Sequence, residues 1–299
     1  MSPLYKFMTS LECSLIIVIT MIIIAIEFRR DPMTPKRPFS VVSVALTAVL
    51  SLTTFTASAH TPYIAPTSFE PVMGGYVTLD ASFAEAFFVP EAAFSGSEYT
   101  VTDTTGEQVA PDTVTELKTR VVVEHKLEDE GTYRISTGSR EGGVFLFYEV
   151  DGESKRAMNP TEPLPEGAEV KMHFQSITRA DTYVTHKKPS SVALKVEETG
   201  LQILPLTHPN SIFAGEEAQV KLIFDGEAHQ NTLEAYPANG EHEAEPTKFE
   251  SNENGVVNFT LPAGKYLLKV RHRAPAPEGA NVPTYSHTTT LSILVFADN

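Results

Sequence analysis

Short alternating runs of apolar and polar residues dominate the chain after residue 60, and turns rich in Gly, Pro, Asn and Asp separate them. Helical periodicity is nearly absent from this region. Alternation with a period of two is typical of a half-buried β-strand, and strands at this spacing favour a sandwich or a barrel. The pattern therefore predicts an all-β protein.

Turn signals mark the ends of several predicted strands. Asp151-Gly152 follows an apolar run and is a strong short-range signal for a hairpin, while Asp225-Gly226 ends a second strand. Residues 255–261 and 264–270 are both strand-like and are separated by two residues. We expect these two strands to form a hairpin with each other.

A change in composition divides the chain after residue 60 into two parts. Residues 187–199 begin with the polar run Lys-Lys-Pro-Ser-Ser and are interpreted as a linker. We therefore expect an N-terminal β domain over residues 60–186 and a C-terminal β-sandwich over residues 200–299. About seven strands in the second part fit an immunoglobulin-like or transthyretin-like sandwich.

The N-terminal region carries the features of an export signal. An apolar run over residues 39–55 follows Lys36 and Arg37, and it ends in Ala-Ser-Ala at residues 57–59. A basic start, an apolar run and small residues at positions −3 and −1 define a secretory signal peptide. Residues 33–59 are therefore interpreted as a signal peptide.

Cleavage after Ala59 would make His60 the first residue of the exported protein. Residues 1–32, which contain a short apolar run, are interpreted as an upstream extension from a misplaced start. The alternative is a membrane hairpin with both apolar runs inserted and its basic connection in the cytoplasm. Both interpretations place the rest of the chain outside the inner membrane. We expect a periplasmic protein, which stays membrane-anchored if the signal is not cleaved.

Charge and cysteine content limit which partners and which metal ligands the exported part can have. Residues 60–299 hold 18 Lys+Arg against 35 Asp+Glu, and this acidic balance argues against nucleic acid as a partner. The single cysteine, Cys13, lies in the N-terminal apolar region, so the exported part has neither disulfides nor thiolate metal ligands. Any metal ion would have to be bound by His, by carboxylates or by the chain terminus.

Several blocks spread over residues 60–299 together resemble a family of bacterial periplasmic proteins of unknown function, often labelled a NikM-like periplasmic component of nickel or cobalt uptake. The matching blocks are His60–Pro66, Leu79–Glu85, Phe87–Pro90, Glu124–Leu127, Gly131–Arg134, Asp181–Thr185, Leu204–Asn210, Ala214–Glu217 and Gly255–Phe259. The resemblance implies a two-part β architecture and a role in transition-metal uptake, with an inner- or outer-membrane metal transporter as a partner. It supplies no catalytic mechanism.

An N-terminal histidine is itself a potential metal chelate. After cleavage, the α-amino group and the imidazole Nδ1 of His60 can bind one ion, and one more imidazole would complete a T-shaped nitrogen site. This geometry suits Cu(II) or Ni(II), and it resembles the histidine brace of copper-binding periplasmic proteins and of oxidative polysaccharide-cleaving enzymes. We therefore predict that His60 binds a divalent transition-metal ion: Ni, Co or Cu.

The second imidazole has two main candidates. His125 lies in a long predicted strand, and His208 lies at a strand exit. Each also has a structural interpretation, because a strand histidine is often packed or solvated and a histidine at a turn can stabilise it by a hydrogen bond. His229, His272 and His287 have no support beyond their residue type.

Enzyme signatures are absent: the chain has no nucleophile elbow, no phosphate-binding loop and no His-Glu-x-x-His motif. The sequence therefore predicts a periplasmic metal-binding protein that serves uptake or homeostasis, and not an enzyme. One alternative is a structural or carbohydrate-binding β-sandwich module without metal. The other is a histidine-brace oxidative enzyme, which the lack of Trp and of exported Cys disfavours.

Overall fold

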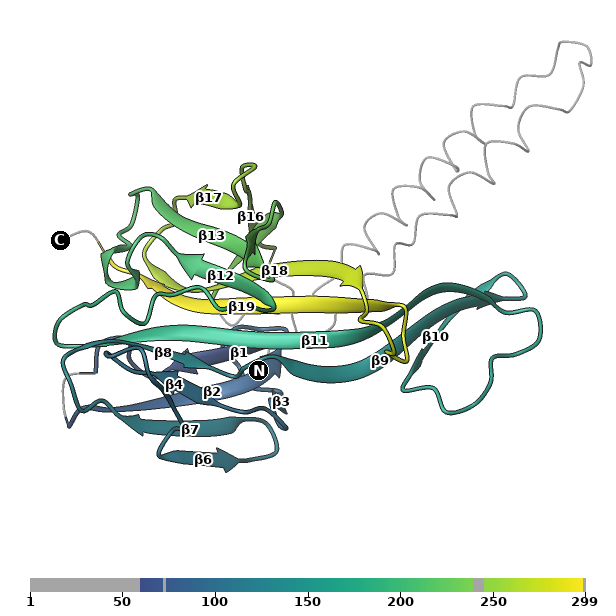
Figure 1. The fold of residues 1–299 in the computed structure, drawn as a ribbon, viewed down its shortest axis with the longest axis horizontal. Helices are drawn as coiled ribbons and strands as arrows, with labels where there is room; N and C mark the ends of the chain where they lie inside the picture. The colour runs from purple at the N-terminus through teal and green to yellow at the C-terminus, as the bar shows by residue number, and fades with distance from the viewer. Residues whose placement is uncertain (1–59, 72–73, 239–244, 298–299) are drawn as a thin grey trace, which may run out of the picture. The chain divides into compact units, whose positions relative to one another are not determined.

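The computed structural model describes residues 60–71, 74–238 and 245–297, and their regular secondary structure is almost entirely β-strand, as predicted (Figure 1). They belong to one compact unit, Ser58–Asn299. The predicted signal peptide, with Ala59, and the predicted upstream extension lie outside the described residues. Within the described ranges the one helical element is the 3-10 turn η1, Pro209–Ser211, and no helix is long and apolar enough to cross a bilayer.

Eleven strands lie before residue 187. They are β1 (Thr61–Pro66), β2 (Tyr76–Ala84), β3 (Ala92–Ala93), β4 (Thr100–Thr102), β5 (Gln108–Val109), β6 (Thr113–Glu116), β7 (Val121–Lys126), β8 (Gly131–Ser136), β9 (Arg140–Val150), β10 (Glu153–Met158) and β11 (Glu169–His186). Alternation is clear in β7, where buried and half-buried residues alternate over the whole strand.

Eight strands follow residue 200. They are β12 (Leu201–Pro205), β13 (Ala218–Phe224), β14 (Glu227–Ala228), β15 (Thr232–Pro237), β16 (Thr247–Glu250), β17 (Val256–Phe259), β18 (Gly264–Pro275) and β19 (Thr284–Val295). Together the strands form sheets of five, ten and four strands.

The two largest hydrophobic cores lie on different parts of the ten-stranded sheet. The five-stranded sheet, in the order β1-β2-β7-β6 with β3 on β2, covers β4, β8 and part of β11. The four-stranded sheet, in which β13 pairs with β12, β14 and β17, covers β15, β18 and β19. Leu79 and Ile135 are fully buried in the first core, and Leu222 and Leu268 are fully buried in the second.

A parallel pairing of β11 with β19 joins the two sandwiches. Nine residue pairs, from Phe174↔Thr284 to Thr182↔Ser292, define its register. Val184 of β11 contacts the first core and its neighbour Tyr183 contacts the second, because successive side chains of a strand point to opposite faces. One strand therefore contributes to both cores.

The segment 187–199, predicted as a linker, packs against the sandwich strands. Ala193 in this segment is fully buried. The carboxylate of Glu197 accepts hydrogen bonds from Arg179 of β11 at 2.6 and 2.8 Å and forms an ion pair of 3.0 Å with Arg134 of β8. The segment is therefore tied to the shared sheet by ion pairs between half-buried Glu197 and two buried arginines.

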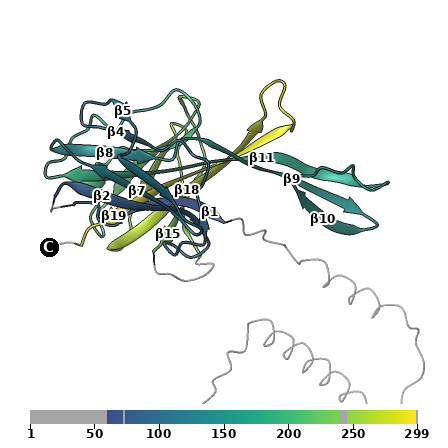
Figure 2. The same cartoon turned by 90° about the horizontal axis from the view of Figure 1, so that it is seen from below.

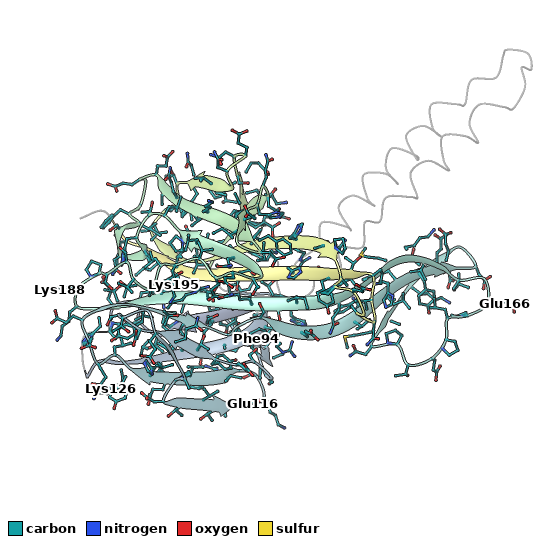
Figure 3. The ribbon with its side chains drawn as sticks, viewed as in Figure 1. Phe94, Glu116, Lys126, Glu166, Lys188 and Lys195 are labelled. Carbon is teal, nitrogen blue, oxygen red and sulfur yellow. The ribbon has the colours of Figure 1, made fainter. Side chains whose placement is uncertain are left out.

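Strands β9 and β10 and the first half of β11 project beyond the two cores (Figures 1 and 2). Glu166, in the connection between β10 and β11, lies at the far end of this arm (Figure 3). Phe174 of β11 stacks on Phe145 and Phe147 of β9 at ring-centroid distances of 5.3 and 6.2 Å. Most side chains of the arm are half-buried or exposed.

Two predicted turns are confirmed, and one predicted pairing is wrong. Asp151-Gly152 joins β9 to β10 with positive φ angles of 53° and 76°, and Asp225-Gly226 ends β13 with φ angles of 49° and 79°. The strands β17 and β18, however, do not pair: β17 pairs with β13, whereas β18 pairs with β15 and β19. The short connection crosses the core instead of turning within one sheet.

Candidate functional site

His60 directly precedes β1 and lies beside a carboxylate. Its Nδ1 is 2.9 Å from Oε2 of Glu91, and its side chain is 53% exposed. Two hydrogen bonds position Glu91. The backbone N–H of Glu91 donates to the hydroxyl of Ser82 at 3.3 Å, and Oε1 of Glu91 accepts from the backbone N–H of Glu85 at 3.0 Å. The first described residue of the chain is therefore close to an oriented anionic group.

The structure does not bring His60 and His125 together. Thr61, next to His60, pairs with Ala84 at one end of β2, whereas His125 pairs with Val77 near the other end. Seven residues of extended strand separate these positions, or about 23 Å at ~3.3 Å per residue. Since metal–nitrogen bonds are about 2 Å long, the two imidazoles cannot bind one ion.

His208 uses both ring nitrogens in hydrogen bonds. Its Nδ1 accepts from the backbone N–H of Asn210 at 3.1 Å and caps η1. Its Nε2 lies 3.1 Å from the carbonyl oxygen of Ser190 and 3.2 Å from the hydroxyl of Thr132. This geometry fits the turn-stabilising role, and ligation would require these bonds to break.

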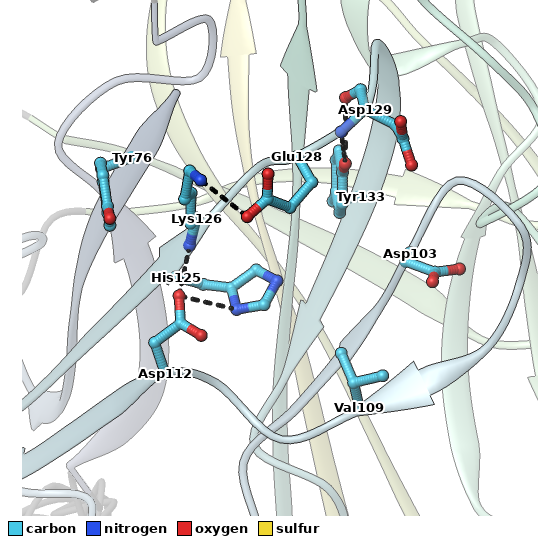
Figure 4. A pocket seen from close by; sticks show the side chains of 9 residues that line it. All are labelled: Tyr76, Asp103, Val109, Asp112, His125, Lys126, Glu128, Asp129 and Tyr133. Atoms are coloured by element: carbon cyan, nitrogen blue, oxygen red, sulfur yellow. Dashed lines mark hydrogen bonds and ion pairs between the residues drawn. The ribbon is translucent and has the colours of Figure 1, made fainter. Parts of the chain in front are cut away.

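His125 lies in the wall of a cavity of about 330 Å³ (Figure 4). The cavity is lined by Tyr76, Asp103, Val109, Asp112, His125, Lys126, Glu128, Asp129 and Tyr133. His125 is 9% exposed, and its Nδ1 is enclosed without a hydrogen-bond partner in the described part of the chain. The nearest charged atom is Oδ2 of Asp112 at 3.6 Å, which is too far for a hydrogen bond.

The charges around this cavity have a fixed arrangement. Figure 4 shows the Asp112 carboxylate facing the His125 ring, and Oδ2 of Asp112 accepts the backbone N–H of Lys126 at 2.7 Å. The ammonium group of Lys126 pairs with Glu128 at 2.7 Å. Burial lowers the pKa of His125, and the acidic neighbours only partly oppose this effect. At neutral pH the imidazole is therefore uncharged and keeps a lone pair.

A second group of histidines, which the sequence did not single out, gathers in the C-terminal sandwich. His272 of β18 pairs with His287 of β19, and the His229 ring lies 4.1 Å from that of His272 between centroids. Phe224 contacts the rings of His272 and His287 at 4.6 and 5.1 Å. Burial lowers the pKa of all three histidines, and His272 adds to the effect on the other two. Three neutral imidazoles thus pack around one aromatic ring.

Among the described residues, no group of three or more His, Cys, Asp or Glu side chains is already arranged to hold a metal ion. The pairs present are His60 with Glu91 and His125 with Asp112. The sequence pattern identified both histidines but neither carboxylate, because only strand pairing brings these acidic residues close. A metal ion at either position would need further ligands, such as water, to complete its coordination.

Comparisons with known proteins place the chain in a family without assigning an activity. No curated protein matches it. A DUF4785 family protein from Legionella pneumophila subsp. pneumophila str. Philadelphia 1 is 13% identical, with a TM-score of 0.22; the match covers 70% of this chain and 51% of that one. Fibronectin(III)-like modules of Clostridium thermocellum CbhA are 10% identical, with a TM-score of 0.19 and coverage of 78% and 94%. Murine CEACAM1b is 10% identical, with a TM-score of 0.19 and coverage of 79% and 100%.

The chain spans about half the length of the Legionella protein, and similarities this weak say nothing about function. The sequence match is more informative, because it extends over most of both sandwiches. Residues 57–274 match a family described as a domain of unknown function, and the chain belongs to this family, DUF4198.

Proposed function

We propose that the chain is an exported, periplasmic protein that binds a divalent transition-metal ion (Ni, Co or Cu) and serves metal uptake or homeostasis. The ligands are the α-amino group and the imidazole of His60 after cleavage at Ala59. The NikM-like resemblance of the sequence blocks supports a role in nickel or cobalt uptake. In this proposal the protein captures the ion and presents it for uptake, and it does not catalyse a reaction.

The observation that carries the proposal is the contact between His60 and Glu91. A carboxylate 2.9 Å from Nδ1 lies close to where an ion chelated by this nitrogen would be. Its negative charge would offset part of the ion's charge and favour a cation there. The exposed position of the imidazole gives an ion access from solvent, and the paired strand that follows holds the residue in place.

Isothermal titration with Ni(II) and Cu(II) tests the chelate on protein that starts at His60 and on the same protein acetylated at its N-terminus. Acetylation turns the α-amine of His60 into an amide and leaves no other amine at the terminus, so we expect one-to-one binding to weaken at least about tenfold, since a ligand is lost. Glu91→Gln should weaken binding less and leave the stoichiometry unchanged. Equal affinity of the two N-terminal forms rules out the chelate.

A carbohydrate-binding module is the second candidate, and the arm formed by β9–β11 is the observation that favours it. Phe145, Phe147 and Phe174 stack there with partly exposed rings, and aromatic surfaces of this kind can contact sugar rings. A polysaccharide pull-down with wild type and Phe174→Ala tests it. This candidate is removed if the polysaccharide does not retain the wild type, or if it retains the wild type and Phe174→Ala equally.

A further inference from the structure

The cavity beside His125 contains a nitrogen whose environment is unusual. Nδ1 of His125 is enclosed and has no hydrogen-bond partner in the described ranges. An enclosed polar atom without a partner loses its hydrogen bonds to water and gains none in return, so such atoms are rare in folded proteins. An ion bound to the lone pair would compensate for this loss.

Asp112 is placed to provide a second ligand to the same ion. Its Oδ2 is 3.6 Å from Nδ1 of His125. With metal–ligand bonds of about 2.0–2.2 Å, two ligands at a tetrahedral angle lie about 3.4 Å apart. The spacing is therefore too long for a hydrogen bond but close to that of two ligands of one ion. The backbone N–H of Lys126 fixes the carboxylate in this position.

The rest of the cavity favours a hydrated cation. Asp103, Glu128 and Asp129 add three carboxylates to its lining, against the single ammonium of Lys126, which is already paired with Glu128. This excess of negative charge raises the local concentration of cations. The volume of about 330 Å³ leaves room for several water molecules, which can complete the coordination shell.

We propose that His125 and Asp112 form a second cation site, which binds a hydrated divalent ion of the borderline class such as Zn(II), Co(II) or Ni(II). One imidazole nitrogen favours these ions over Ca²⁺ and Mg²⁺, which take oxygen ligands. The absence of sulfur ligands disfavours Cu(I). The site lies at the other end of β2 from His60, so it does not depend on the proposed function.

The test uses Zn(II) alone on the purified full chain. Calorimetry gives the affinity, and NMR of the imidazole Cε1 protons identifies His125 as the resonance missing from His125→Asn. Asp112→Asn keeps an oxygen for the Lys126 N–H but loses the charge, and Glu153→Gln removes an exposed carboxylate far from the cavity. We expect Zn(II) to shift the His125 resonance, and Asp112→Asn and His125→Asn to weaken this binding at least about tenfold. Glu153→Gln should match the wild type.

His60→Ala separates this site from the proposed chelate, because it should leave the His125 shift unchanged. Thermal unfolding without metal shows whether each variant is folded, and Asp112 is exposed enough for its amide variant to fold. The proposal is overturned if millimolar Zn(II) leaves the His125 resonance in place. It is equally overturned if Asp112→Asn binds Zn(II) as tightly as the wild type.

Discussion

Replacing Asp181 by Asn removes the negative group that lies between two buried guanidinium groups. Asp181 is 2% exposed and accepts hydrogen bonds from Arg134 at 2.9 Å and from Arg179 at 3.0 Å. Without the carboxylate, the two arginines share only Glu197, which is 26% exposed. Loss of one partner from a buried ion pair costs about 3–5 kcal/mol, since the remaining charge is uncompensated.

The pH dependence of this effect has a definite sign. Burial by itself would raise the pKa of Asp181, but Arg134 and Arg179 outweigh burial and hold the pKa below its ordinary value. The carboxylate therefore stabilises the fold at every pH above its unfolded pKa of about 3.9, and this contribution is lost as the pH falls through the folded pKa. The difference between wild type and variant should shrink in acid.

Urea unfolding followed by circular dichroism at pH 7 measures the free energy of unfolding that Asp181→Asn loses. In thermal unfolding, a cost of about 3–5 kcal/mol corresponds to a fall in Tm of roughly 6–20 °C for a chain of this size. The matched control is Glu153→Gln, which removes an exposed ion pair with Lys155 and should cost at most about 1 kcal/mol. If the Asp181 variant loses no more stability than this control, the reasoning about buried charge is refuted.

Two further predictions concern stability. The lowered pKa values of His229, His272 and His287 mean that the unfolded chain binds more protons, so the free energy of unfolding should fall as the pH drops below about 6.5. Urea titrations at pH 7.5 and 5.5 measure this fall in the free energy of unfolding. If the free energy of His272→Asn falls as much between the two pH values as that of the wild type, the prediction is contradicted. Gly255→Ala should cost at least about 2 kcal/mol, because φ is +73° and a Cβ would lie 2.5 Å from a backbone carbonyl oxygen. Gly279→Ala, with φ of +86° and open space around it, should cost only the backbone strain of about 1–2 kcal/mol; equal losses would show that the close contact is unimportant.

Local features of the fold could be predicted from the sequence because their causes are local. Asp151-Gly152 and Asp225-Gly226 tolerate positive φ, and both form the expected turns. The pairing of residues 255–261 with 264–270 could not be predicted in this way. A short connection is compatible with a hairpin or with a crossing between two sheets. Which of the two forms depends on how all the strands together bury their apolar side chains, and this cannot be read from the two strands alone.

In the candidate sites, too, some features could be predicted from the local sequence and others depend on strand pairing. His60 and His125 could be identified from residue type and sequence context, but their acidic neighbours depend on strand register. Glu91 reaches His60 through the β2–β3 pairing, and Asp112 reaches His125 through the β6–β7 pairing. The imidazole cluster required the pairing of His272 with His287, which no local pattern indicates.

The parallel register between β11 and β19 also limits how this protein can move and how it can be divided. Modules joined by a flexible tether can swivel, so the reach of one relative to the next varies. Here nine residue pairs of a shared sheet take the place of such a hinge. A cut within residues 187–199 would leave each half with a bare strand edge, where exposed backbone groups invite aggregation. Separating the two sandwiches, or swivelling one against the other, would therefore require the backbone hydrogen bonds between β11 and β19 to break.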